Sequence, residues 1–173
     1  MRKALFLDRD GVINKDYGYV HKKDNFEFIE GIFELIKSAN NLSYLVIVIT
    51  NQAGIGRNFY TEDTFLKLTL WMCKKFQEKN CIIDAIYYCP YHPIYGRGEF
   101  KKDSYLRKPN PGMIIEASNK HKIDLDKSIL VGDKEHDIEA GLASGILKNY
   151  LFSQEAKTSK KYNLINNLNE IIL

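Results

Sequence analysis

The stretch ALFLDRDG, residues 4–11, joins four apolar residues to two aspartates and a glycine. A short, near-continuous apolar run is typical of a strand that is covered on both faces, so we expect a strand over Ala4–Leu7. Asp8 and Asp10 would then lie at its carboxyl end. Gly11 allows the chain to turn sharply away from the strand.

Four more apolar runs are expected to form strands, at 44–49, 82–88, 128–131 and 147–152. Helical patterns lie between them: one over 32–39, one capped by Thr61, one capped by Asn110 with Pro111 at its first position, and one over 136–144. Strands that alternate with helices predict an α/β fold, a doubly wound parallel sheet with helices on both faces. We expect 154–161 to be a mobile surface segment before a short final helix.

Composition limits the class of protein. A length of 173 residues with 45% apolar content predicts one domain over 1–173. A net charge of +3 is too small to indicate nucleic acid or a membrane surface as a partner. The sequence has no apolar run near the roughly 20 residues of a spanning helix, no signal peptide and no disulfide spacing. We therefore expect a cytoplasmic protein, a monomer, that acts on a small molecule.

Polar residues follow three of the expected strands. Because ligands bind beyond the carboxyl ends of parallel strands, these residues should share one crevice. They are Asp8, Asp10, Thr50, Asn51, Asp133 and Asp137. Four carboxylates in one crevice repel one another unless a cation lies among them, and an all-oxygen ligand set suits Mg²⁺.

The spacing of Asp8 and Asp10 suits phosphoryl transfer. Asp8 can attack phosphorus as a nucleophile, and Asp10 can protonate the leaving oxygen and later activate water. Lys108 can neutralise charge on the transferred group. Each segment alone has a simpler explanation: solvated loop aspartates, a Thr-Asn turn, or a surface lysine.

A helix start is the simpler explanation for the segment Gly132-Asp133-Lys134-Glu135-His136-Asp137, because acids are common in a first turn. The functional reading makes Asp133 a metal ligand and Asp137 the residue that supports it. Four segments thus carry polar residues of interest, and they occur in order, each at a strand end or a helix start: Asp8–Gly11, Thr50–Asn51, Arg107–Pro109 and Gly132–Asp137. That combination is far more specific than any one of them.

Together the four segments resemble the haloacid dehalogenase superfamily of phosphotransferases, over nearly the whole chain. The resemblance implies a nucleophile at Asp8, an acid/base at Asp10, a phosphoryl-binding hydroxyl at Thr50 and a phosphoryl-binding lysine at Lys108. It implies Mg²⁺ held by Asp8, Asp10 and Asp133. Residues 11–49 hold only a flap, Asp16–Tyr19, and one expected helix, so we expect no large cap domain.

Further segments are similar to the D-glycero-D-manno-heptose 1,7-bisphosphate phosphatases, notably Asp8–Asn14, Asn25–Phe28, Thr50–Gln52, Tyr87–Pro90, Arg107–Pro109 and Val131–Lys134. This resemblance implies removal of the C7 phosphate, which leaves heptose 1-phosphate for surface polysaccharide. It implies substrate contacts from Asp16, Tyr17, Gly18, Tyr19, Asn51, Gln52, Ala53, Arg107 and Lys134. The alternatives are a histidinol-phosphate phosphatase, another small sugar-phosphate phosphatase, or a phosphosugar-binding protein that is no enzyme.

The sequence departs from these phosphatases at a structural zinc site. Many of them carry Cys-x-His and then Cys-x-Cys before Arg-Lys-Pro. The matching positions here are Cys89, Tyr91, Ser104 and Leu106. A structural zinc site needs four Cys or His ligands, so we expect no zinc. The long loop 89–106 would instead be held by packing of Tyr91, Tyr95, Phe100 and Tyr105, with looser substrate selection.

Overall fold

The computed structural model describes residues 1–155 and 158–173. Its strands are β1 (Ala4–Leu7), β2 (Leu45–Asn51), β3 (Ala85–Cys89), β4 (Ile129–Gly132), β5 (Lys148–Phe152) and β6 (Asn163–Ile165). Its α-helices are α1 (Ile32–Asn41), α2 (Ala53–Gly56), α3 (Glu62–Glu78), α4 (Gly112–His121) and α5 (Glu135–Ser144). Single 3₁₀ turns lie at Lys23–Asn25, Gly98–Phe100, Leu125–Lys127 and Leu168–Glu170.

The strands form one parallel sheet in the order β3-β2-β1-β4-β5-β6, with β1 near its centre. The chain moves outward from β1 through β2 to β3 and then crosses to β4 on the other side. This crossover places the carboxyl ends of β1, β2 and β4 beside one another, which is where open α/β sheets bind ligands.

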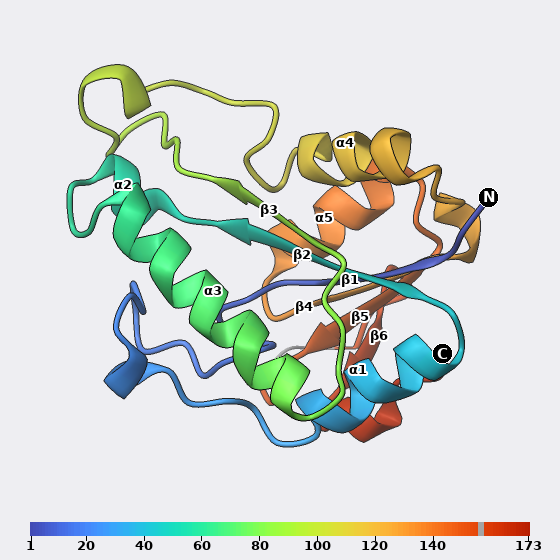
Figure 1. Ribbon diagram of the computed structural model, residues 1–173. Coiled ribbons are helices and arrows are strands. Elements are labelled where there is room, and N and C mark those ends of the chain that lie inside the picture. Colours follow the sequence, from blue (N-terminus) through green and yellow to red (C-terminus); the bar gives the residue numbers. More distant parts are fainter. Residues whose placement is uncertain (156–157) are drawn as a thin grey trace.

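Helices cover both faces of the sheet (Figure 1), as the alternating pattern predicts. Alternate residues of β1 enter different cores, because successive side chains of a strand point to opposite faces. Leu5 and Leu7 pack with α1, α3 and the C-terminal segment. Ala4 and Phe6 pack with α4 and α5. The strand that carries Asp8 is thus fixed from both sides.

The expected elements agree with the structure in type and differ at their ends. β1 has the expected bounds, and Thr61 caps α3 by accepting a hydrogen bond from the Thr64 amide at 3.1 Å. Thr50 and Asn51 are the last residues of β2 rather than residues that follow it. α2 and β6 were not expected, because each is only three or four residues long.

The expected cap at Asn110 is wrong. Pro111 occupies the N-cap position of α4, and no side chain caps that helix. The Asn110 side chain donates instead to the Ser104 carbonyl at 3.1 Å, so it fastens the preceding loop. The expected final helix is a single 3₁₀ turn at Leu168–Glu170. Of the expected mobile segment 154–161, residues 156 and 157 lie outside the described residues.

No large cap covers the sheet edge: between β1 and β2 the described chain has one 3₁₀ turn and α1. Within 1–155 and 158–173, no helix combines the length and the apolar character needed to cross a membrane.

Candidate active site

A pocket of about 330 Å³ lies at the carboxyl ends of β1, β2 and β4. Side chains from the strand ends, the flap and the loop before α4 line it: Asp8, Asp10, Asp16, Gly18, Tyr19, Thr50, Asn51, Gln52, Ala53, Tyr60, Arg107, Lys108, Lys134 and His136. Most of the residues that the sequence singled out therefore meet in one place. Tyr17 does not line the pocket, and its hydroxyl donates to Glu27.

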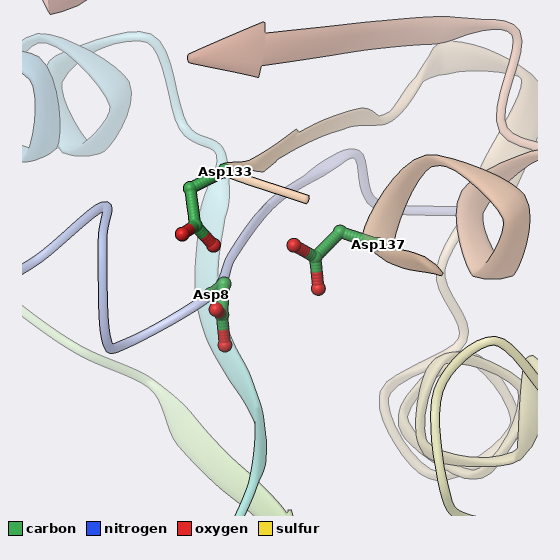
Figure 2. A group of neighbouring side chains, drawn as sticks. All are labelled: Asp8, Asp133 and Asp137. Atoms are coloured by element: carbon green, nitrogen blue, oxygen red, sulfur yellow. The ribbon is translucent and has the colours of Figure 1, made fainter. Parts of the chain in front are cut away.

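Three carboxylates converge beside the pocket: Asp8 after β1, Asp133 after β4 and Asp137 in the first turn of α5 (Figure 2). Asp8 lines the pocket, whereas Asp133 and Asp137 lie outside its lining. One oxygen from each lies within 4.8 Å of the others. Gly11 makes the approach possible, because its φ is +101° and an added Cβ would lie 2.3 Å from the Asp133 carboxyl group. This group is the only one of its kind within the residues that the structure describes.

Lys108 lies between two of these carboxylates. Its Nζ is 2.8 Å from Asp8 Oδ1 and 2.6 Å from Asp137 Oδ1, and it also donates to the Ile49 carbonyl at 2.9 Å. Burial opposes the charged form of Lys108, but Asp137 and Asp8 outweigh it and raise the pKa of the ammonium. Burial also opposes the charged form of Asp137, and Lys108 outweighs it and lowers the pKa of that carboxyl. Both groups are therefore charged at neutral pH.

Asn51 holds this lysine in place. Its side-chain amide donates to the Lys108 carbonyl and accepts from the Lys108 amide, both at 3.1 Å. The end of β2 is thereby joined to the loop before α4, across 57 positions of sequence. Thr50 has a hydroxyl in the pocket that accepts from Gln52 Nε2 at 2.9 Å.

Asp8 and Asp133 are unfavourable as charged groups in the protein alone. Burial raises the pKa of Asp8 to about 8 although Lys108 opposes it, and Asp137 and Asp133 add to the rise. Burial likewise raises the pKa of Asp133 to about 6 although Lys134 opposes it. Asp133 Oδ1 is buried, and none of the described residues offers it a hydrogen bond. A small divalent cation would remove the repulsion and satisfy this oxygen, so the residues fit a metal site.

Asp10 lies outside the three-carboxylate group, unlike the metal set expected from the sequence. Arg9 donates to both of its oxygens, at 3.0 and 2.8 Å. Asn14 and Gln52 each donate to it at 3.0 Å, and Tyr60 in turn donates to Gln52 at 2.5 Å. The Asp10 side chain is fixed at the pocket wall, and its role as a magnesium ligand stays a prediction.

The rim of the pocket comes from the flap at residues 16–19 and from loop 89–106. Lys134 Nζ is 2.8 Å from Asp16, which joins the start of the flap to the first turn of α5. Arg107 donates to the Tyr91 carbonyl at 3.2 Å, and Lys102 Nζ lies 3.9 Å from the centre of the Tyr91 ring. Burial lowers the pKa of Arg107, although the guanidinium stays charged.

Loop 89–106 is held by contacts that need no metal ligand. Cys89 is fully buried, and the nearby His92 Nδ1 accepts from the amides of Ile94 and Tyr95. The expected aromatic packing applies to Tyr91 and Phe100, whose ring centres are 5.9 Å apart. It does not apply to Tyr105, which is 61% exposed. The absence of zinc stays a prediction.

Known proteins resemble this chain closely. Residues 4–166 match the family described as polynucleotide kinase 3 phosphatase. A D-glycero-alpha-D-manno-heptose-1,7-bisphosphate 7-phosphatase of Burkholderia mallei is 54% identical over 83% of this chain and 76% of its own length. The chain belongs to the heptose-bisphosphate phosphatases of the haloacid dehalogenase superfamily. It is therefore a phosphatase, not a binding protein on the same fold.

Two more relatives extend the comparison. A Haemophilus influenzae phosphatase named for the beta anomer of the same bisphosphate is 46% identical over 87% of this chain and 82% of its own length. The crystal structure of a D,D-heptose 1,7-bisphosphate phosphatase from B. bronchiseptica, complexed with magnesium and phosphate, has a TM-score of 0.84 at 24% identity and covers 96% of this chain and 93% of that one. This last likeness supports the fold.

Sequence reasoning missed several residues that build the site. Arg9 and Asn14 lie inside the segment Asp8–Asn14 but were not given a role, although a charged residue between two strand-end aspartates, as at Arg9, is a usable signal. Tyr60 and His136 also line the pocket. No pattern marks Tyr60, whose contact with Gln52 depends on the close approach of its ring to Gly54 in α2, where a Cβ would lie 2.2 Å from the ring.

Proposed function

We propose that this phosphatase removes the C7 phosphate of D-glycero-D-manno-heptose 1,7-bisphosphate through an aspartyl-phosphate on Asp8. The observation that carries the proposal is the position of Asp8: its carboxylate lines the pocket and lies 2.8 Å from Lys108 Nζ. A carboxylate held beside a fixed cation at the floor of a pocket is well placed to meet a phosphoryl group.

The reaction follows in two balanced steps. An Asp8 oxygen attacks phosphorus, the bond from phosphorus to the C7 oxygen breaks, and Asp10 gives its proton to that oxygen. Water then attacks the phosphorus of the aspartyl-phosphate while Asp10 takes a proton, which releases phosphate and restores Asp8. Lys108 and the Thr50 hydroxyl bind the phosphoryl oxygens throughout, and the four hydrogen bonds on Asp10 keep that carboxyl oriented.

Asp8 and Asp133 would hold Mg²⁺, with Asp137 supporting them through Lys108. Bound there, the ion would neutralise the carboxylates and stabilise charge on the phosphoryl oxygens. The Asp10 carboxylate would not bind this ion directly, because Arg9, Asn14 and Gln52 hold it. Removal of magnesium with a chelator should stop turnover, and added magnesium should restore it.

Two observations favour a sugar bisphosphate as the substrate: the names of the relatives and a cationic side chain at the rim of the pocket. Relatives at 54% and 46% identity are named for heptose 1,7-bisphosphate. Two further cationic side chains, Arg107 and Lys134, line the pocket. Lys134 lies 3.5 Å from Asp133, so Arg107 is the rim cation that suits a second phosphate. Heptose 1-phosphate would then pass to the synthesis of nucleotide-activated heptose and surface polysaccharide.

Steady-state kinetics on both anomers of heptose 1,7-bisphosphate and on histidinol phosphate test the proposal. We expect kcat/KM for one anomer to exceed that for histidinol phosphate by about a hundredfold, since a site built for a second phosphate leaves charged groups unpaired without it. A preference for histidinol phosphate would contradict the proposed substrate while leaving the phosphatase mechanism intact. The two anomers are both needed because the relatives carry names for each.

A further inference from the structure

Arg57 lies among three aromatic rings at the outer edge of the pocket. Its guanidinium carbon is 4.6 Å from the ring centre of Phe59, 4.9 Å from that of Tyr95 and 5.3 Å from that of Tyr19. All three distances are within the range of cation–π attraction. Arg57 Nη1 also donates to the Tyr19 hydroxyl. One side chain therefore joins the flap, the segment after α2 and loop 89–106.

These rings would be poorly held without the arginine. Tyr19, Phe59 and Tyr95 are 42%, 46% and 56% exposed, so little apolar burial fixes them. Tyr19 and Phe59 pack edge to face with ring centres 4.7 Å apart. Within 1–155 and 158–173, Arg57 has no carboxylate partner among the ion pairs. The ring faces and the Tyr19 hydroxyl are its partners instead.

Arg57 itself has a fixed position. It is the C-cap residue of α2, which starts two residues after the end of β2. A Cβ on Gly56 would lie 2.4 Å from the Pro90 carbonyl oxygen, so α2 and loop 89–106 are in direct contact. The Arg97 amide donates to the Gly56 carbonyl at 2.8 Å and adds a second link. The arginine therefore acts from a rigid support.

The flap needs such a support. Tyr19 has a φ of +53° and follows Gly18 at +77°, and a Cβ added to Gly18 would meet nothing within 4 Å. The start of the flap is held by Asp16 and Lys134. At its far end, Arg9 donates to the carbonyl of the buried Val20 at 2.7 Å, so the backbone there is held, whereas Arg57 contacts the Tyr19 side chain. Tyr19 lines the pocket. The Tyr19 side chain is thus fastened by a residue that does not line the pocket.

We propose that Arg57 is a positioning residue for substrate selection, which holds Tyr19 of the flap against loop 89–106 so that the part of a phosphosugar beyond its reacting phosphate meets a closed wall. The proposal rests on the proposed function for the nature of the substrate. A small aryl phosphate reaches only the floor of the pocket and needs no such wall.

Kinetics of Arg57→Met, Arg57→Lys and the control Arg97→Met test this role. Arg97 is an exposed arginine of loop 89–106. Within the described residues, its side chain has no hydrogen bond, ion pair or ring contact. For heptose 1,7-bisphosphate we expect KM to rise about tenfold in Arg57→Met with kcat within about twofold, as for loss of uniform binding. Arg57→Lys should recover part of the loss, because it keeps the cation but not the planar fork.

The same variants are assayed with p-nitrophenyl phosphate, for which both constants should stay within about twofold of the parent protein. Equal losses on the two substrates, or a fall in kcat with KM unchanged, would overturn the proposal. The Arg97→Met control should match the parent on both substrates. Melting curves by circular dichroism establish that each variant is folded.

Limited proteolysis gives a readout that does not depend on the substrate. Chymotrypsin should cut after Tyr17 and Tyr19 several-fold faster in Arg57→Met than in the parent or in Arg97→Met, because local opening exposes the flap. An unchanged rate would show that Arg57 does not hold the flap, even if heptose bisphosphate is a substrate. A faster rate in a protein that ignores heptose bisphosphate would support Arg57 and refute the proposed substrate.

Discussion

The floor and the rim of the pocket are built in different ways. The floor is built on buried charges that strand and helix ends bring together: Asp8, Lys108 and the adjacent Asp137 are 6%, 3% and 0% exposed and are joined by ion pairs below 3 Å. The rim consists of exposed aromatic and cationic side chains on loops. The floor can therefore hold a charged reacting group in one geometry, while the rim can change its contacts without disturbing the chemistry.

The largest effect is expected at the floor, from Asp8→Asn. An amide cannot form the acyl-phosphate, so kcat should fall by about a thousandfold or more. The melting temperature without metal should not fall, since the amide is neutral and the carboxyl it replaces has its pKa raised to about 8 by burial. Turnover assays and circular dichroism melts check both parts. Near-normal turnover would refute the covalent mechanism.

Lys108→Met should damage both activity and stability. It leaves Asp8 and Asp137 facing each other with no cation, and breaking such a buried pair costs about 3–5 kcal/mol in free energy of unfolding. The double variant Lys108→Met with Asp137→Asn should regain part of the stability but none of the activity. Urea unfolding measures the stability of both variants, and turnover assays measure their activity. If the double variant is no more stable than the single one, the buried charges are not coupled as described.

Stabilisation by magnesium should depend on pH. Burial raises the folded-state pKa of Asp8 to about 8 and of Asp133 to about 6 from an ordinary 3.8, so their protonated forms favour the metal-free fold. The contribution of these protonated carboxyls to the free energy of unfolding is fully present below about pH 4 and is lost as the pH rises through 6 and 8. Magnesium must displace these protons, and it should therefore raise the melting temperature by about 5 °C or more at pH 8 and by less at pH 5.

Calorimetric melts with and without saturating magnesium at the two pH values measure this difference. Asp133→Asn serves as the control and should lose most of the shift at pH 8. An equal shift at both pH values would mean that the ion binds without displacing protons from these carboxyls.

The smallest effect is expected at the rim, from the removal of zinc. Cys89 is the only cysteine of the four matching positions, and His92 is engaged with backbone amides. Protein purified without chelator should carry far less than one zinc per chain. Treatment with a chelator followed by excess magnesium should leave the melting temperature unchanged. About one zinc per chain, retained through dialysis, would contradict this prediction.

For physical reasons, the sequence predicts where the strand-end residues lie but not which side chains contact one another at the rim. Buried strands leave long apolar runs, and the polar residue that ends each run lies at a fixed edge of the sheet, as for Asp8 and Thr50. The ion pair of Lys108 with Asp8 was not predicted, because no local pattern links two residues 100 positions apart.

Contacts between side chains leave no periodic signal. The donors around Asp10 and the rings around Arg57 depend on loop paths and rotamers. Asn110 illustrates the same point, because its sequence context favours a helix cap while a nearby carbonyl offers a competing partner. Short elements such as α2 and β6 contain too few residues to show a pattern.

The central position of β1 has a consequence for the chain as a ribosome makes it. The Asp8 amide donates to the Val131 carbonyl at 3.0 Å, and the Ala4 amide donates to Ser128 at 3.0 Å. Asp8, the proposed nucleophile, is translated more than a hundred residues before its partners on β4 and α5. Pairing over such separations is slow and exposes the unpaired strand meanwhile. The nascent protein is therefore catalytically silent until β4 docks, and activity should appear in one late step rather than grow with chain length.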